Sequence, residues 1–490
     1  MAAIKEILDL VMAEEWNGNL DTAFTGVHYD SRKISKGDIF VAVPGFKTDG
    51  HKFIPQAVER GACGVVLERD EFAPDEIPWV KVKDARLALS RLAAFLYDYP
   101  SSKLRLIGVT GTNGKTTTTF LIEKILCQAE KKAGLIGTIE NRINGKKINT
   151  HFTTPDALEL NHLFSQMVSE GVEAAVMEVS SHALALKRVA DCDFDAGVFT
   201  NLTQDHMDFH PDVQDYLRSK AILFRQLGRG SKNGHHYAVV NVDSPYAGDI
   251  ISVTDVPVKT YGIKNQADLC AKNIRVSSLG TFFDVSGMGV ECSLKLKLVG
   301  RFNVYNALAA FSVGLMENIP LQVIKSALED TAGVPGRFES IHEGQDFGVI
   351  VDYAHTPDGL HNILRTAREI TQGRVITVFG CGGDRDRGKR PLMGEAAAVH
   401  SDYCIVTSDN PRSEEPLSII EDILPGVQKI TDCFRIIQDR REAISTAIKM
   451  ARKGDTVVIA GKGHENYQLV GDEVLHFDDR EEARNVLRSL

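Results

Sequence analysis

Apolar and polar positions along the chain follow a strand-then-helix rhythm. Short apolar runs of about four to eight residues are typical of buried strands, and segments with apolar residues every three or four positions are typical of helices. The clearest strand runs are KLRLIGVTG, AGLIGT, EAAVMEVS, FDAGVFTN, HYAVVNVD, GVIVDYA, RVITVFG, YCIVTSD and DTVVIAGK. The clearest helical segments are KTTTTFLIEKILCQAEK, PDGLHNILRTAREI and RREAISTAIKMAR. This order predicts an α/β protein with largely parallel sheets.

Two breaks in the rhythm divide the chain. The first follows YPSSK near residue 100, and the second is the Gly/Pro-rich segment TAGVPGRFE before residue 340. A chain of 490 residues is also long enough for about three domains, because single cores stop growing at about 250–300 residues. We therefore predict three domains: residues 1–100, a central domain of residues 101–335 with a mostly parallel P-loop-type sheet, and a Rossmann-like domain of residues 336–490.

Composition narrows the functional classes. The net charge of −10 gives no electrostatic footprint for nucleic acid. The eight cysteines are scattered singly, without a C-x-x-C pair, which disfavours a zinc site or a disulfide framework. No apolar run approaches the ~20 residues that span a bilayer, and the acidic N-terminal segment has no signal-peptide pattern. We expect a cytoplasmic protein without nucleic-acid partners or membrane insertion.

The segment TGTNGKTT at residues 110–117 joins the first strand of the central domain to a helix. Such a loop directs backbone N–H groups and a helix N-terminus at a phosphate. Lys115 would reach the outer phosphates, and the hydroxyl of Thr116 would bind Mg²⁺. Val109 stands where the strict motif has its first glycine. A turn that only caps a helix is the alternative, but the order of strand, loop, Lys-Thr and helix favours a nucleoside triphosphate site.

Two polar residues further along the chain are candidates for contact with the nucleotide or its metal ion. Glu178 in MEVSSH ends a buried strand, where open α/β sheets place their ligands, but a solvated residue at the rim is also common there. His206 lies in TNLTQDHMDFH among other His and Asp residues, which fits either a metal site or a hydrogen-bonded loop. Mg²⁺ prefers oxygen ligands, so direct contact with a histidine would be unusual.

Lys220 lies within an apolar stripe formed by Leu217, Ala221 and Phe224 on a predicted helix. A lysine in such a place usually extends its ammonium group to the surface. If it is held inside, burial lowers its pKa and leaves a neutral amine that can add CO₂. The resulting carbamate is an anionic oxygen ligand suited to Mg²⁺. Spacing alone leaves both possibilities open.

The motifs GTNGKTTT, MEVSSH, TNLTQDHMDFH, YLRSKAILF, GRFNVYNALAA, GVPGRFE, VDYAHTPD and GKGHE stand in this chain in the order seen in the Mur ligases of peptidoglycan synthesis. The N-terminal segment YDSRKISKGDIFVAVPGFKTDGH resembles the UDP-binding domain of that family. The resemblance covers essentially the whole chain. It implies an ATP- and Mg²⁺-dependent ligase that forms an amide bond and releases ADP and phosphate.

The resemblance also implies roles for single residues. Catalytic roles fall to Lys115, Lys220, Glu178 and His206. The nucleotide would be held by Gly111, Thr112, Asn113, Gly114, Lys115, Thr116, Thr117, Asn303, Asn306, Arg337 and Asp352. The metal ligands would be Thr116, Glu178, His206 and Lys220 as its carbamate. The UDP-sugar peptide would be held by Ser31, Thr153, Thr154, Ser180 and Arg188.

The segment SDNPRSEEP at residues 408–416 is an ordinary turn signal before a helix. In the branch of the family that it resembles, D-N-P-R recognises meso-diaminopimelate, which would be joined to UDP-N-acetylmuramoyl-L-Ala-D-Glu. That amine carries a second carboxylate that L-lysine lacks, and an arginine can clamp it bidentately. The residues expected to bind the amine are Arg385, Asp409, Asn410, Pro411, Arg412, Gly461 and Glu465.

Other functions remain as alternatives. A related ligase would add L-lysine or another amine, a dipeptide, or glutamate to folate. The N-terminal domain and the DNPR segment argue against these, and Arg412 is the discriminating residue. A phosphotransferase or nucleotide switch would need no amine. A scaffold without catalysis would not need Lys115, Glu178 or Lys220. We expect the ligase to act as a monomer.

Overall fold

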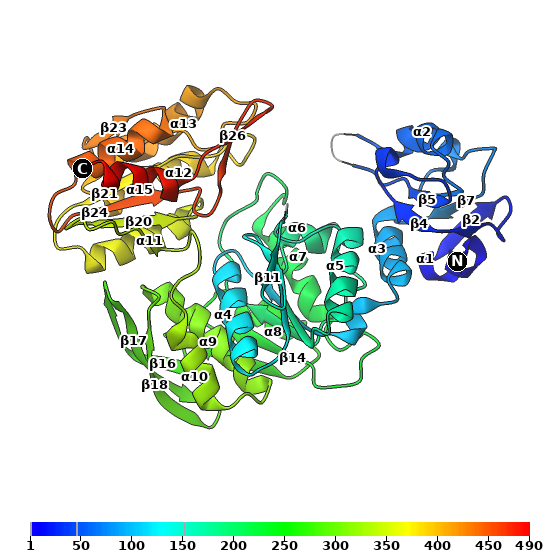
Figure 1. Cartoon of the computed structure of the whole chain (residues 1–490), viewed down its shortest axis with the longest axis horizontal. Helices are drawn as coiled ribbons and strands as arrows, with labels where there is room; N and C mark the ends of the chain where they lie inside the picture. Colours follow the sequence, from blue (N-terminus) through cyan, green and yellow to red (C-terminus); the bar gives the residue numbers. More distant parts are fainter. Residues whose placement is uncertain (1, 46–47, 151) are drawn as a thin grey trace. The chain divides into compact units, whose positions relative to one another are not determined.

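The computed structural model describes residues 2–45, 48–150 and 152–490. The chain divides into two compact units, one formed by Met1–Gly108, Lys131–Gly197 and Ile222–Tyr237, the other by Val109–Glu130, Val198–Ala221 and Ala238–Leu490. Three larger sheets lie in the predicted segments 1–100, 101–335 and 336–490, which confirms the α/β class (Figure 1). The domain boundaries themselves stay a prediction.

The N-terminal sheet has the strand order β2-β7-β6-β5-β4, and all its pairs are parallel except β2 with β7. Its strands are β2 (Ala13–Asn17), β4 (Gly26–His28), β5 (Asp38–Val41), β6 (Gly64–Leu67) and β7 (Trp79–Val82). The remaining strands and α-helices here are β1 (Ala2–Ala3), β3 (Ala23–Phe24), α1 (Leu8–Val11), α2 (Ile54–Glu59) and α3 (Ala85–Leu96). Alternate residues of β5 enter two separate cores, one including α3 and the other α2, as the period of a strand requires.

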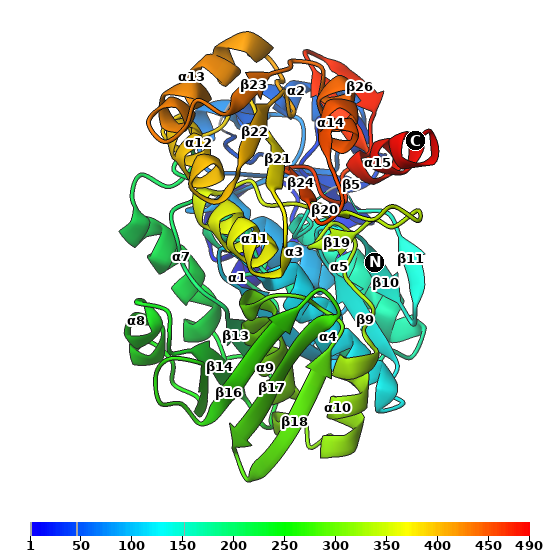
Figure 2. The ribbon, with the colours of Figure 1, turned by 90° about the vertical axis from the view of Figure 1, so that its left-hand side faces the viewer.

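The central sheet has eleven strands in the order β11-β10-β9-β12-β8-β13-β14-β15-β16-β17-β18. They are β8 (Arg105–Thr110), β9 (Ala133–Ile136), β10 (Asn141–Ile143), β11 (Lys146–Ile148), β12 (Ala174–Glu178), β13 (Ala196–Phe199), β14 (Tyr237–Asn241), β15 (Val258–Gly262), β16 (Leu269–Ser277), β17 (Gly280–Gly287) and β18 (Val290–Leu296). Strands β9 and β12 pair in parallel, as do β14 with β15 and β15 with β16. The long strands β16, β17 and β18 form the antiparallel end that Figure 2 shows.

Strands β12, β13 and β14 are buried along their whole length. Such continuous apolar strands are typical of parallel sheets that are covered on both faces. The helices of this segment are α4 (Lys115–Gln128), α5 (Ala157–Ser169), α6 (Ser181–Ala185), α7 (Val213–Arg225), α8 (Ala247–Ser252), α9 (Arg301–Met316) and α10 (Leu321–Asp330).

The C-terminal sheet has the order β19-β20-β24-β21-β22-β23 and is parallel apart from the β19–β20 pair. Its strands are β19 (Glu339–Ser340), β20 (Gly348–Asp352), β21 (Val375–Phe379), β22 (Tyr403–Val406), β23 (Phe434–Ile436) and β24 (Thr456–Ala460). A separate hairpin consists of β25 (Tyr467–Val470) and β26 (Glu473–His476).

Two cores flank this sheet. One includes α11 (Pro357–Ile370), α12 (Lys389–His400) and α13 (Pro416–Gln428), and the other includes α14 (Arg440–Met450) and α15 (Asp479–Arg488). Alternate residues of β21 point into one core or the other, and Figure 1 shows the sheet between α11 and α14. This doubly covered sheet confirms the Rossmann-like class, and its loops at the carboxyl ends of parallel strands form the usual place for a ligand.

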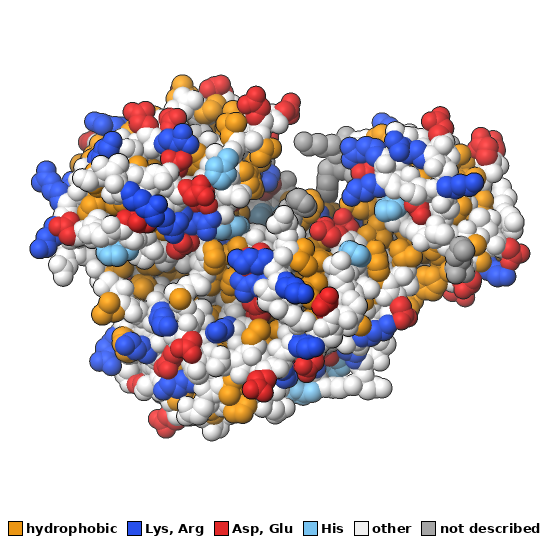
Figure 3. Space-filling model, in the orientation of Figure 1, with side chains coloured by type: hydrophobic (Ala, Val, Ile, Leu, Met, Phe, Trp, Pro, Cys, Tyr) orange, Lys and Arg blue, Asp and Glu red, His pale blue; other side chains and the backbone are white. Residues whose placement is uncertain are grey.

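Within the described ranges, no helix is long and apolar enough to cross a membrane. On the face that Figure 3 shows, Lys and Arg side chains are interspersed with Asp and Glu.

Candidate functional site

The loop between β8 and α4 has the geometry of a phosphate cradle. Gly111 and Gly114 have φ values of 148° and 88°, which favour glycine. A Cβ at Gly111 would lie 1.9 Å from Oγ1 of Thr200, and one at Gly114 would lie 2.4 Å from Oδ1 of Asn306. Lys115 Nζ donates hydrogen bonds of 2.8 Å to the carbonyls of Gly111 and Thr112. The loop therefore leaves no room for side chains at these two glycines, and it holds the Lys115 ammonium group against its own carbonyls.

Lys220 is buried on α7, with 1% of its surface exposed. Its Nζ donates a 2.9 Å hydrogen bond to the carbonyl of Gly111 and lies 4.3 Å from the ring centre of Tyr216. Burial and the nearby Lys115 ammonium lower the pKa of Lys220 well below its ordinary value, while Asp205 opposes the shift. The lysine is thus held inside, beside the loop between β8 and α4, rather than extended to the surface.

His206 is in the left-handed region, with φ 59°, in the loop after β13. Its ring Nε2 lies 3.4 Å from the buried carboxylate of Asp205, which also lies 4.0 Å from His355 and 3.9 Å from Lys389. Burial alone would raise the pKa of Asp205, but these three groups outweigh it and lower the pKa to about 2. Asp205 is therefore an anion that orders the His206 loop.

The junction residues reach the same loop. Arg337 donates a 3.0 Å hydrogen bond to the hydroxyl of Thr116, and its guanidinium lies 4.4 Å from the ring centre of Tyr353. Both oxygens of the buried Asp352 accept from backbone N–H groups, of Phe338 at 2.6 Å and of Ala354 at 2.7 Å. Burial raises the pKa of Asp352, against the pull of Arg337.

The predicted adenine residues are buried at the start of α9. Asn306 Nδ2 donates to Oδ1 of Asn303 at 3.0 Å, and Asn303 Nδ2 donates to the carbonyl of Val299 at 2.9 Å. Thr118 Oγ1 donates to Oδ1 of Asn306 at 3.4 Å. Asn306 therefore contacts the first turn of α4 through Thr118.

Glu178 belongs to the first compact unit, where it is 1% exposed at the end of β12. Its carboxylate accepts hydrogen bonds from the N–H of Thr138 at 2.8 Å and from the Thr138 hydroxyl at 3.1 Å. A Cβ at Gly137 would lie 2.5 Å from its Oε1. Glu178 is therefore a fixed, buried carboxylate and not a solvated residue at the rim.

Four of the residues predicted to hold the UDP-sugar peptide lie together near Glu178. Thr154 Oγ1 donates to the carbonyl of Glu178 at 2.9 Å and accepts from the N–H of Ser180 at 3.1 Å. Arg188 Nη1 donates to the carbonyl of Thr154 at 2.9 Å. Thr153 joins the same group, since its hydroxyl oxygen lies 3.0 Å from Thr138 Oγ1.

A pocket of about 640 Å³ within the first unit contains Ser31 and Arg188. Sequence reasoning missed the cations Arg86 and Lys187, which line it as well. Only the concentration of several cations around one cavity reveals them, because each lies in an ordinary helical or turn context. Burial lowers the pKa of Arg86 and of Arg188, so both gain from an anionic ligand.

The predicted amine site follows β21, β22 and β24. We call residues 381–388 after β21 the glycine loop and residues 409–415 after β22 the arginine loop. Arg412 has φ 53°, and its Nη1 donates to the carbonyl of Gly383 in the glycine loop at 2.7 Å. Burial and the nearby Arg385 lower the pKa of Arg412. Both side chains approach Gly382, where a Cβ would lie 2.8 Å from Arg412 Nη1 and 3.8 Å from Arg385 Cγ. Two neighbouring guanidinium groups can together bind one anion.

Other residues of the arginine loop face inward. Asn410 Nδ2 donates to Glu465 Oε2 at 2.9 Å, while its Oδ1 accepts from Lys462 Nζ at 3.1 Å and from the N–H of Leu469 at 3.0 Å. The amide of Asn410 thus holds Glu465 and the β25–β26 hairpin in place. Burial raises the pKa of Glu465, and Asp409 adds to the shift against the pull of Lys462.

Lys462 and Arg440 are buried cations that sequence reasoning missed. Lys462 Nζ lies 3.1 Å from Glu465 Oε2, and Arg440 donates to the carbonyl of Ala460 at 2.9 Å. Burial would raise the pKa of Asp409, but Lys462 and Arg440 outweigh it and lower the pKa. A Cβ at Gly461, whose φ is 121°, would lie 2.6 Å from Oδ2 of Asp409. The GKGHE motif was the available signal for Lys462.

Among the described residues, no group of three or more His, Cys, Asp and Glu side chains is arranged to hold a metal. The predicted ligands include a threonine and a modified lysine, which lie outside that set. The buried hydroxyl of Thr116 and the carboxylate of Glu178 are oxygen donors of the kind that Mg²⁺ takes, and only His206 departs from that preference.

Three family models match consecutive parts of the chain. They are described as "Mur ligase family, catalytic domain" at residues 23–98, "Mur ligase middle domain" at residues 109–314, and "Mur ligase, glutamate ligase domain" at residues 336–463. A UDP-N-acetylmuramoyl-L-alanyl-D-glutamate–2,6-diaminopimelate ligase of Syntrophomonas wolfei is 49% identical, over 99% of this chain and 98% of its own length. The chain belongs to the Mur ligase family.

A second relative of this Mur ligase, with the same printed name and from Clostridium tetani, is 48% identical over 99% of both chains. A solved structure of a ligase of that name aligns over 100% of this chain and 99% of its own, with TM-score 0.69 and 33% identity. A MurF of Acinetobacter baumannii aligns over 94% and 95%, with TM-score 0.66 and 20% identity, and shows the shared fold. These comparisons confirm the family and the ligase class.

Proposed function

We propose that this Mur ligase uses ATP to join meso-diaminopimelate to the γ-carboxylate of D-Glu in UDP-N-acetylmuramoyl-L-Ala-D-Glu. The observation that carries the choice of amine is the placement of Arg412 beside Arg385, with the inward-facing carboxylates of Asp409 and Glu465 nearby. A carboxylate of the amine would lie at the arginines, and its ammonium group would face the two acidic residues. L-lysine has no second carboxylate and would leave the guanidinium pair without a partner.

The nucleotide would lie on the loop between β8 and α4. The N–H groups at the start of α4 point toward that loop and favour negative charge there. Lys115, now bonded to two loop carbonyls, would turn to the phosphate oxygens and stabilise charge on the group in transfer. Arg337, beside Thr116, would add a second cation to the phosphates.

The D-Glu carboxylate is a poor electrophile, so an amine does not displace its oxygen directly in water. Transfer of the terminal phosphoryl group of ATP to that carboxylate gives an acyl phosphate and ADP. The neutral amine then attacks the carbonyl carbon, and phosphate leaves from the tetrahedral intermediate as the amide bond forms.

The residues predicted to hold Mg²⁺ are Thr116, Glu178, His206 and Lys220 as its carbamate. Bound there, Mg²⁺ would supply neutralisation of the phosphate charge. The lowered pKa of Lys220 supports a neutral amine at this position, which is the form that adds CO₂. The pocket with Ser31 and Arg188 would hold the anionic UDP part of the substrate. We further propose that the ligase acts as a cytoplasmic monomer.

The test is phosphate release by the purified protein with Mg-ATP and UDP-N-acetylmuramoyl-L-Ala-D-Glu. Meso-diaminopimelate and L-lysine are supplied in parallel to the wild type and to Arg412→Ala. We expect release that requires diaminopimelate and falls at least about 100-fold in the variant, since a charged bidentate contact is lost. Equal use of lysine would remove the assigned role of Arg412, and release without any amine would remove the ligase activity.

A further inference from the structure

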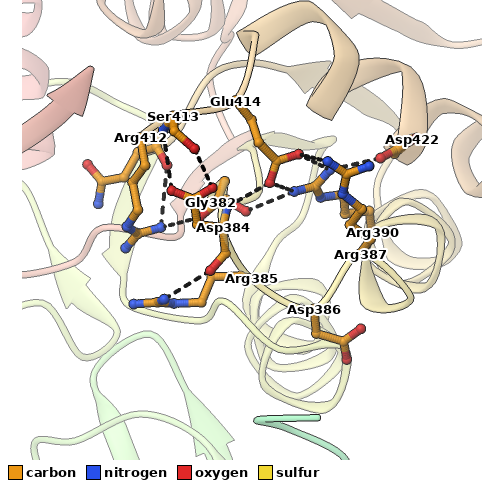
Figure 4. A network of polar contacts seen from close by, with 12 residues as sticks. Gly382, Asp384, Arg385, Asp386, Arg387, Arg390, Arg412, Ser413, Glu414 and Asp422 are labelled. Atoms are coloured by element: carbon orange, nitrogen blue, oxygen red, sulfur yellow. Dashed lines mark hydrogen bonds and ion pairs between the residues drawn. The ribbon is translucent and has the colours of Figure 1, made fainter. Parts of the chain in front are cut away.

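The glycine loop and the arginine loop are bound to each other through a network of polar contacts (Figure 4). The N–H of Gly383 donates to the carbonyl of Asn410 at 2.9 Å, and Arg412 donates back to the carbonyl of Gly383. A Cβ at Gly383 would lie 1.9 Å from the carbonyl oxygen of Pro411. The two loops therefore meet backbone to backbone, and the place of one fixes the place of the other.

Glu414 lies at the centre of this network. Its Oε1 accepts from the backbone N–H of Asp384 at 2.6 Å and from Arg390 Nη2 at 2.8 Å. Its Oε2 accepts from Arg387 Nη2 at 2.8 Å and from Arg390 Nη1 at 3.1 Å. A single carboxylate thus joins the arginine loop to the glycine loop and to the start of α12.

Arg390 is anchored in turn. Its side chain is 1% exposed, and its Nη1 donates to Asp422 Oδ2 on α13 at 2.8 Å. The bidentate pair of Arg390 with Glu414 fixes the relative orientation of the two side chains as well as their distance. Residues of α12 and α13 both belong to the packed core of the C-terminal sheet. The network therefore anchors both loops to that core.

The backbone at two loop residues needs such support. Asp384 and Arg412 have φ values of 54° and 53°, in a region that side chains with a Cβ rarely adopt and that persists only where the surroundings enforce it. Glu414 holds the N–H of Asp384, and Ser413 Oγ donates to Asp384 Oδ1 at 2.7 Å. These contacts keep both residues in the conformation that brings their loops together.

The two arginines expected at the substrate carboxylate depend on that conformation. Figure 4 shows the guanidinium groups of Arg385 and Arg412 on the same side of the loop pair, away from Arg390. Like charges in this position repel each other, so the protein must hold them together before the ligand arrives. We propose that Glu414 and Arg390 are positioning residues that preset Arg385 and Arg412 for one carboxylate and so determine the preference for a dicarboxylic diamino acid over L-lysine.

This inference rests on the proposed function and deepens it. Neither Glu414 nor Arg390 is expected to touch the substrate, so their loss should affect only the binding of the amine. Glu414→Gln replaces the carboxylate by a neutral amide, whose N–H₂ group would face the guanidinium of Arg390. The KM for meso-diaminopimelate is expected to rise at least about tenfold, a loss of about 1.4 kcal/mol in binding. The KM for ATP and that for the UDP-sugar peptide are expected to change less than about twofold.

The matched control is Glu415→Gln, which removes the same charge from an exposed neighbour at the N-cap of α13. The kinetic constants of this control should equal those of the wild type. Arg390→Lys keeps the charge but loses the planar fork, and it should show the same selective rise in KM for diaminopimelate. This second variant carries the test if Glu414→Gln fails to fold, as checked by circular dichroism.

The outcomes separate this inference from the function on which it rests. A selective rise in KM for diaminopimelate, with a smaller ratio of diaminopimelate use to lysine use, supports the positioning role. Wild-type activity with diaminopimelate and an unchanged KM in folded Glu414→Gln and Arg390→Lys overturns the inference alone. Equal losses for all three substrates also overturn it, because they indicate a general structural role. A wild type without amine-dependent phosphate release overturns the proposed function and this inference together.

Discussion

Lys220 Nζ donates a 2.9 Å hydrogen bond to the carbonyl of Gly111, although 109 residues separate the two in the chain. The bond joins α7 to the loop between β8 and α4. It places a buried amine of lowered pKa next to the loop that is proposed to hold phosphates. The carbonyl of Gly111 also accepts from Lys115, so one backbone oxygen orients both lysines.

Replacement of Lys220 tests the proposed carbamate. Lys220→Ala should lower the rate of phosphate release at least about 100-fold, because an oxygen ligand near the transferring phosphoryl group is lost. Added short-chain carboxylic acids should restore part of the rate by occupying the space of the carbamate. Lys124→Ala, at an exposed position of α4, is the control. Full activity without any added acid would contradict the role.

The loop between β8 and α4, which is proposed to hold phosphates, should not tolerate a side chain at Gly111. In Gly111→Ala the new Cβ meets Thr200 Oγ1, and the positive φ adds about 1–3 kcal/mol of strain. We expect ATP affinity to fall about tenfold or more, as measured by calorimetric titration. Gly234→Ala, where a Cβ would meet nothing within 4 Å, should bind ATP as the wild type does. Equal affinities for the two variants would argue against a phosphate at this loop.

Arg440 and Asp479 form an ion pair in which both side chains are fully buried, with 2.7 Å between Nη2 and Oδ2. Arg440→Met leaves a buried carboxylate without its partner and should cost about 3–5 kcal/mol of stability. The neighbouring Arg441 pairs with Glu482 while 63% exposed, so Arg441→Met should cost less than about 1 kcal/mol. Urea unfolding followed by circular dichroism compares the two variants. Similar urea midpoints for the two variants would show that the buried pair contributes no more to stability than the exposed pair.

The Glu414–Arg390 pair should make the free energy of unfolding depend on pH in the acidic range. The hydrogen bond from Arg390, helped by the N–H of Asp384 against the effect of burial, lowers the pKa of Glu414 from 4.5 to about 2. Because the pKa in the folded state lies below that in the unfolded state, the contribution is complete above about pH 4.5 and is lost as the pH falls toward about 2.

The difference in Tm between the wild type and Glu414→Gln should therefore be constant from about pH 5 to pH 7 and shrink below about pH 4. Thermal melts across this pH range measure it, with Glu415→Gln as the control whose difference stays small throughout. A difference for Glu414→Gln that does not change with pH would mean that the pair is held by shape rather than by charge.

Much of the fold was open to prediction from the sequence because its signals are local. The apolar runs at β8, β12, β21 and β24 appear as strands close to the predicted bounds, and the segment PDGLHNILRTAREI forms α11 over its whole length. The order of strand and helix implied parallel sheets, since a parallel pair needs a crossover of that length. Some of the candidate residues, among them Gly111, Arg385 and Gly461, lie in loops after these strands, where a parallel sheet usually places its ligands.

The state of single side chains was not open to prediction. Spacing left Lys220 either exposed or buried and Glu178 either solvated or fixed, because a stripe or a strand end says nothing of what packs against it. In the tertiary structure Lys220 is buried beside Gly111, and both carboxylate oxygens of Glu178 accept hydrogen bonds from Thr138. Their roles at a metal stay predictions.

The sequence by itself determined the class of fold and the family, because these depend on periodicity and on ordered motifs. Only the tertiary structure decided which charges face one another. No motif singled out Glu414 or Arg390, and their pairing depends on α12 and α13 packing on one face of the sheet. Such a pairing is a long-range property, since no local pattern records which loop lies beside which.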